Sequence, residues 1–128
     1  MARAFKVTTT TAAVSAQLVA GGAASIFYGV VATGAGNNAT YYLKLYWEGT
    51  GTAAPTASNP VQTTTTPTAG TTVPQMTIQI PAAGVLPSST VEPVNNGGRL
   101  WYWITTSLAD NAAAVLATGG DSVSIIFD

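Results

Sequence analysis

The sequence predicts an all-β protein, folded as a single antiparallel β-sandwich or jelly-roll-like domain with a long Thr/Ala/Pro-rich loop or arm. Three observations support this fold class: apolar and polar residues alternate in short runs, the runs end at Gly, Pro or Asn, and long helical periodicity is missing. Several short strands at this spacing are typical of a sandwich. They do not fit a βαβ protein, in which strands alternate with long helices.

The chain of 128 residues is long enough to close one hydrophobic core. Residues 1–24 are expected to form an N-terminal arm or the first strands, with weaker strand patterns at 5–10 and 15–20. Residues 25–128 are expected to form the sandwich domain. An Ala-rich stretch at 12–24 is interrupted by polar residues, unlike the apolar region of a secretory signal. No apolar segment is long enough for a membrane span.

Period-2 alternation predicts the main strands at residues 25–32, 41–47, 76–80, 99–106 and 122–128. In the second of these, the odd-numbered residues share an apolar face, and Lys44 lies on the opposite face, which we expect to meet water or a partner. The fourth strand has two apolar faces. If one of them is core, the other should be covered by a second layer, a subunit or a ligand.

Three segments are less regular. Residues 95–98 read as a turn rich in Asn and Gly. Residues 108–118 could form a short helix with Asp110 as its cap, or a loop between strands. Residues 49–72 carry no charge and are rich in Thr, so we expect a long loop or arm. That arm either becomes ordered against a neighbouring subunit or stays disordered.

The composition excludes several kinds of chemistry. The chain has no His and no Cys, so His-based acid-base catalysis, catalytic triads and thiolate sites are absent. Charged residues make up 7% and the net charge is −1, with basic residues scattered, which argues against a nucleic-acid partner. The acidic residues are expected to be solvated loop carboxylates, not a catalytic pair: Glu48, Glu92, Asp110, Asp121 and Asp128.

No cofactor or metal is expected. Asp110, Asn111 and Asp121 could supply oxygen ligands to calcium if their loops converged, but the repeating acidic spacing of a calcium loop is missing. The Gly pairs lack the Lys of a phosphate-binding loop. The sequence therefore predicts a protein that is not an enzyme.

The aromatic residues are the best candidates for contacts, because large side chains with polar tips contribute strongly to binding. We select a partner interface made of Tyr42, Trp47, Arg99, Trp101 and Trp103. Packing in the core and stacking on carbohydrate remain alternatives for the same side chains.

A series of phrases resembles a family of small phage virion proteins encoded among head and tail genes. The phrases, in chain order, are YYLKLY, VPQMTIQIP, NGG before RL, ITTSLADN and GDSV. The similarity covers most of the chain from Ser25 onward. This sequence departs from the family pattern in the length of residues 49–72.

The resemblance implies a virion structural protein, assembled in the host cytoplasm. The low charge and the Thr-rich arm fit a capsid decoration or cement protein, a class of β-sandwich proteins that often act as trimers. Its partners would be the major capsid protein or other virion proteins, with no nucleic acid and no membrane. The alternative is a receptor-binding or carbohydrate-binding module on a tail or fibre.

Overall fold

The computed structural model describes residues 3–7, 16–17, 26–32, 40–49, 66–80, 94–95, 99–112 and 123–128. These residues form eight strands and no helix, which confirms the all-β prediction at this level. Accordingly, the described ranges contain no helix long and apolar enough to cross a membrane.

The strands occur in the order β1 (Arg3–Val7), β2 (Ala16–Gln17), β3 (Ile26–Ala32), β4 (Tyr41–Glu48), β5 (Met76–Ile80), β6 (Val94–Asn95), β7 (Arg99–Thr105) and β8 (Val123–Phe127). All five main strands predicted from the alternation are present, with ends shifted by at most two residues. The weak patterns at 5–10 and 15–20 overlap β1 and β2, and the rest of each predicted range lies outside the described residues. Short β6 was not expected.

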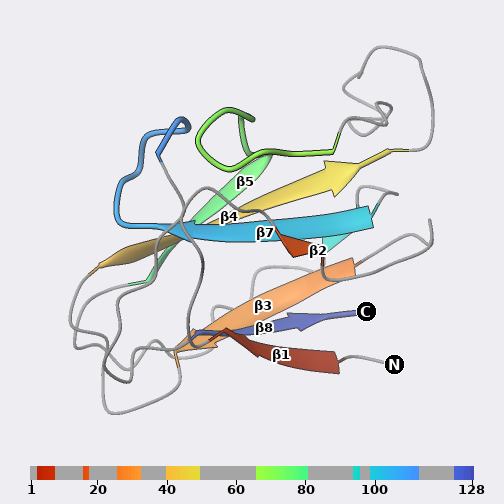
Figure 1. Ribbon diagram of the computed structural model, residues 1–128. Coiled ribbons are helices and arrows are strands. Elements are labelled where there is room, and N and C mark those ends of the chain that lie inside the picture. The colour runs from red at the N-terminus through yellow and green to blue at the C-terminus, as the bar shows by residue number, and fades with distance from the viewer. Residues whose placement is uncertain are drawn as a thin grey trace.

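The strands form two antiparallel sheets of four strands each, ordered β1-β8-β3-β6 and β2-β7-β4-β5. Figure 1 shows the second sheet above the first. Phe5 of β1 contacts Tyr102 of β7, with ring centroids 5.8 Å apart, so aromatic side chains connect the sheets. Arg3 lies over the ring of Phe127, its neighbour in the β1-β8 pair, at 4.9 Å.

The pair β4-β7 is the centre of the second sheet. Its register runs without interruption from Tyr42 opposite Thr105 to Glu48 opposite Arg99. Because side chains alternate across a strand, the pair has two faces. We call one the Leu43 face, formed by Tyr41, Leu43, Leu45, Trp47, Leu100, Tyr102 and Ile104. The other is the Lys44 face, formed by Tyr42, Lys44, Tyr46, Glu48, Arg99, Trp101, Trp103 and Thr105.

Two uncertain predictions are settled in part. Residues 106–112 form bends and a turn, so the first part of the possible helix at 108–118 is not helical, and its remainder lies outside the described residues. In the predicted turn at 95–98, Asn95 belongs to β6 and the other residues lie outside the described ranges. Within the long arm, only residue 49 and residues 66–72 are described.

Candidate functional site

The Lys44 face is the candidate site, because it combines charged, aromatic and hydroxyl side chains on two central strands. Strand alternation alone places them together, since each even-numbered residue of β4 lies opposite an odd-numbered residue of β7. Two segments of the same chain cover this face. They are residues 66–72, which precede β5, and residues 106–112, which follow β7.

Residues 66–72 cover the end of the face that carries Tyr46. Ala69 is 3% exposed and packs with Tyr46 and Trp103, while Trp101 lies partly buried against this cluster. A compact turn shapes the segment. The backbone nitrogen of Thr72 donates to the Thr68 carbonyl oxygen at 2.8 Å, and the Thr72 hydroxyl accepts from the Thr68 nitrogen at 2.8 Å.

Gly70 at the centre of this turn has a φ of 83°, in the left-handed region that glycine adopts without steric cost. The segment therefore packs on its own sheet. Residues 66–72 thus have a defined conformation without a neighbouring subunit. The rest of the arm, residues 50–65, lies outside the described ranges.

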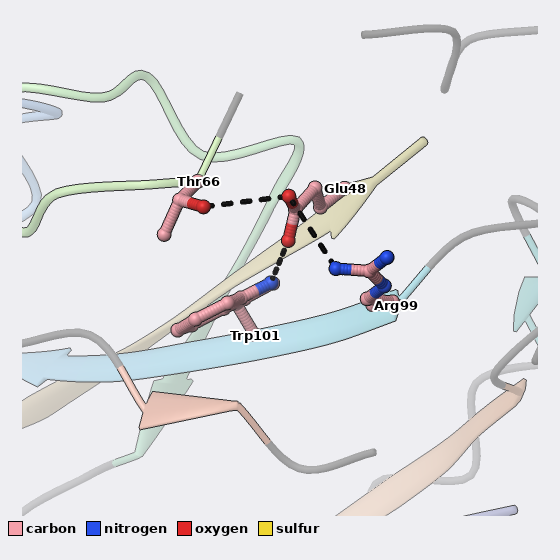
Figure 2. A network of polar contacts seen from close by, with 4 residues as sticks. All are labelled: Glu48, Thr66, Arg99 and Trp101. Atoms are coloured by element: carbon pink, nitrogen blue, oxygen red, sulfur yellow. Dashed lines mark hydrogen bonds and ion pairs between the residues drawn. The ribbon is translucent and has the colours of Figure 1, made fainter. Parts of the chain in front are cut away.

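Glu48 connects this segment to both strands (Figure 2). Its Oε2 accepts a hydrogen bond from Trp101 Nε1 at 2.8 Å. Its Oε1 accepts from the Thr66 hydroxyl at 3.4 Å and lies 3.8 Å from an Arg99 guanidinium nitrogen. Glu48 is only 4% exposed, so the expectation of a solvated loop carboxylate is wrong here. A buried carboxylate needs such donors to offset its lost hydration.

Lys44 connects the sheet to the other covering segment, residues 106–112. Its Nζ donates a hydrogen bond to the Leu108 carbonyl oxygen at 2.6 Å and lies 5.9 Å from the centre of the Tyr42 ring. The side chain has no exposed surface, so the expectation that this face meets water is wrong at Lys44. Burial lowers the pKa of Lys44 below its ordinary value of 10.5, against the smaller, opposing effect of the Asp110 charge.

The turn that Lys44 holds is also stabilised locally. The Thr105 hydroxyl donates to the Ser107 carbonyl oxygen at 2.6 Å, and the Ser107 hydroxyl accepts from the Ala109 nitrogen at 3.2 Å. Leu108 nevertheless leaves its own side chain 64% exposed. A buried lysine thus fixes the backbone of a turn that presents an aliphatic side chain to the outside.

The five residues selected as a partner interface fall into two groups. Trp47 and Trp103 are 1% and 0% exposed, so they lie inside the chain and offer no surface in this conformation. Tyr42, Arg99 and Trp101 are partly exposed on the Lys44 face. Arg99 and Trp101 lie near one end of the β4-β7 pair, beside Glu48 and Tyr46, whereas Tyr42 lies at the other end, opposite Thr105.

Sequence reasoning missed Gln75. Its backbone nitrogen donates to the Leu45 carbonyl oxygen at 2.9 Å, and its side-chain oxygen accepts from the Trp47 nitrogen at 2.7 Å. The side chain thereby extends the β4-β5 pairing by a hydrogen bond just where β5 begins. A polar residue before a strand is too common a pattern to have identified this role.

The structure describes only some of the candidate acid-base and calcium residues, and it does not bring those together into a metal-binding group. Asp110 and Asn111 are exposed in the turn after β7, while Glu92 and Asp121 lie outside the described residues. Among the residues that the structure describes, no three metal-ligating side chains form a group. Two buried donors in the same part of the chain, Arg99 Nε and Trp103 Nε1, lack an acceptor.

Comparison with known proteins gives no indication of the function. No protein family, no curated protein and no solved structure matches the chain. Proposals about its function therefore rest on the contacts, burial and charge of the described residues, together with the resemblance noted in the sequence.

Proposed function

We propose that the protein is a non-enzymatic structural component of a phage particle, a decoration or cement protein that binds the capsid and holds neighbouring subunits together. One observation carries this proposal. Buried charged side chains hold residues 66–72 and 106–112 over the Lys44 face, and an exposed aliphatic side chain lies in or next to each segment, Leu108 in the second and Val73 just after the first. Asp110 is the one charged residue of the two segments.

These contacts within the chain matter because binding costs conformational entropy when loops become ordered only in the complex. Glu48 ties Thr66 to the strands, and Lys44 ties the backbone of Leu108. Both tethers act within the free chain. The covering segments therefore need little further ordering when a partner binds, which suits a protein whose task is to hold subunits in place.

The surface chemistry supports a protein partner. Residues 66–80 contain no charged side chain, and Val73 and Leu108 are 63% and 64% exposed. Centres of protein interfaces are depleted in charge and enriched in apolar contacts. Each Å² of apolar area buried contributes roughly 25 cal/mol before association costs. Repetition of a modest contact around a symmetric shell adds avidity.

The fold proposed for this role is a β-sandwich in which the Leu43 face packs toward the sheet that contains β1. The contact between Phe5 and Tyr102 supports this arrangement, since Tyr102 belongs to the Leu43 face. A sandwich leaves the Lys44 face and its covering segments on the outside, where a capsid subunit can reach them.

The test is to purify particles of the phage that encodes the chain and to examine them by mass spectrometry after a high-salt wash. We expect the protein to remain on the heads in a fixed ratio to the major capsid protein. Heads that lack it should open at a lower temperature. Absence from washed particles would refute the proposal.

Matched variants identify the surface. V73D/L108D places charges at the two exposed aliphatic positions, and T71D/T106D places the same charges at exposed polar positions two residues before each of them. We expect the first variant to lose binding to heads that lack the protein, and the second to retain it. Equal binding by both would remove this surface from the proposal.

A second candidate function, a carbohydrate-binding module on a tail or fibre, is favoured by Trp101. This side chain is partly exposed, and its Nε1 is held by Glu48, which gives the ring a defined orientation. Oriented aromatic rings stack on sugars. A glycan array combined with a tryptophan-fluorescence titration tests it, and retention of the protein on tails alone would favour it over decoration.

A further inference from the structure

The outer strands of the two sheets differ in how they are protected from pairing with other chains. An edge strand exposes unpaired backbone groups, and proteins guard such edges by shortness, charge, proline or bulges. Among the described strands, β1 carries Arg3 and Lys6, which is a recognised protection of an edge. The edges β2 and β6 are described over two residues each, too short a stretch to offer a regular pairing surface within the described ranges.

The fourth edge, β5, shows none of them. Its five residues, MTIQI, contain neither charge nor proline, and Pro74 lies before the strand. Its pairing with β4 is regular over five consecutive residue pairs, without a bulge. Within the described part of the sheet, β4 is its single neighbour.

The apolar layer is also incomplete at this strand. Leu43 and Leu45 of β4 have no exposed surface, whereas their partners on β5, Ile78 and Met76, remain partly exposed. The Leu43 face therefore continues onto β5, where Ile80 is fully buried and Met76 and Ile78 remain only partly covered. An added strand that carries apolar residues on this face would complete the layer.

The strand itself has the pattern that such an addition needs. If two copies of β5 pair antiparallel with Ile78 opposite Ile78 of the second copy, Met76 lies opposite Ile80 and Thr77 lies opposite Gln79. Apolar residues then meet apolar residues on one face, and polar residues meet polar residues on the other. The two-fold axis places Ile78 beside its own copy and the other residues beside different residues of the same strand, so a strand without charged side chains avoids like-charge repulsion.

We infer that β5 is a dimerisation edge, at which the β5 strands of two copies of this chain pair antiparallel about Ile78 and join their sheets into one. This surface is separate from Val73 and Leu108, and the inference does not depend on a place in a virion. The two-fold arrangement replaces the trimer that the resemblance implied.

Two variants that differ at one position test the register. In T77E/Q79K, position 77 of each copy faces an opposite charge at position 79 of the other. In T77E/Q79E, the same positions carry like charges. Thr77 lies opposite Lys44 within the chain, so the glutamate common to both variants sits beside a lysine rather than another carboxylate. T71E, at an exposed position outside the strand, is the control.

Light scattering coupled to size-exclusion chromatography gives the mass over a range of concentrations, and circular dichroism checks that each variant is folded. We expect a wild-type dimer, unchanged in T71E. The dissociation constant should be at least about tenfold higher for T77E/Q79E than for T77E/Q79K, because two cross-strand charge pairs change sign. High salt should narrow the difference.

A wild-type chain that stays monomeric at millimolar concentration, or that forms a trimer, would overturn the inference. So would a dimer in which the two charged variants have equal dissociation constants. Neither result would bear on binding to phage heads, which is measured separately with the variants at Val73 and Leu108.

Discussion

The two faces of the β4-β7 pair are both largely buried, but different kinds of residue bury them. The Leu43 face consists of aliphatic and aromatic side chains, with Leu43, Leu45, Leu100 and Ile104 at 0% exposure. The Lys44 face includes a lysine and a glutamate at 0% and 4% exposure. The first face follows the ordinary rule for a core. The second buries the residue types that are seldom buried without partners.

The difference lies in what covers each face. Residues 66–72 and 106–112 are turns, and turns bring backbone carbonyl oxygens and hydroxyl groups over the sheet. A charged side chain beneath them can then form the hydrogen bonds that offset its desolvation. The charged side chains of the Lys44 face therefore stabilise the packing of the two covering segments on the sheet. Altering the two faces should therefore have different consequences.

The largest effect is expected on the Leu43 face. L43A removes a fully buried side chain that lies between Ile78 and Ile104 in the sheet, and should lower the free energy of unfolding by about 2–5 kcal/mol through lost burial and a new cavity. Urea denaturation measures it. V73A, at an exposed position, should change stability by less than about 0.5 kcal/mol. Equal losses in both would contradict the assigned core.

The next effect concerns Glu48. E48A leaves the partly buried Trp101 indole nitrogen without its acceptor and removes the ion pair with Arg99, which should cost about 2–3 kcal/mol in unfolding free energy. E48Q retains a side-chain oxygen of similar size and should cost less than half as much. If both variants match the wild type in urea denaturation, the network does not fasten residues 66–72.

A smaller effect is expected for W101F, which removes the indole donor but keeps an aromatic ring. The loss should be about 1.5–2 kcal/mol in the wild-type background, toward the lower end of what one hydrogen bond to a charged group contributes. In the E48A background the same substitution should cost much less, because the acceptor is already gone. A double-mutant cycle by urea denaturation compares the two costs, and additive losses would argue against the contact.

The smallest effect at neutral pH is expected for K44M. The substitution removes a buried charge, which is favourable, and it also removes the hydrogen bond to the Leu108 carbonyl oxygen, which is unfavourable. Because the two effects oppose each other, the free energy of unfolding should change by no more than about 1 kcal/mol. The pH dependence is more informative than the neutral value. Because burial lowers the pKa of Lys44 below 10.5, the unfolded chain binds more protons than the folded chain as the pH approaches 10.5.

The wild type should therefore gain stability relative to K44M as the pH rises through the window between the lowered pKa and 10.5. Urea denaturation of both proteins at several alkaline pH values gives the difference. Burial raises the pKa of Tyr102, which acts in the opposite direction above pH 10, but Tyr102 is present in both proteins and cancels. A difference that does not vary with pH would show that Lys44 is solvated.

The positions of the main strands could be predicted because they depend on the local sequence pattern. Alternation and bounding turn residues located β3, β4, β5, β7 and β8 to within two residues, because strand periodicity and turn chemistry are properties of neighbouring residues. The same alternation separated the Leu43 face from the Lys44 face. Composition further excluded histidine and cysteine chemistry in the whole chain.

The tertiary structure alone decided what each face meets. Lys44 and Glu48 are the residues a sequence would place in water, and they are buried because residues distant in the chain fold over them. Trp47 and Trp103 are buried, while Trp101 keeps partial exposure, although all three look alike in the sequence. Strand order, and with it the edge position of β5, depends on pairings between distant segments. Periodicity is local and carries no information about those pairings, whereas burial is the sum of all long-range contacts.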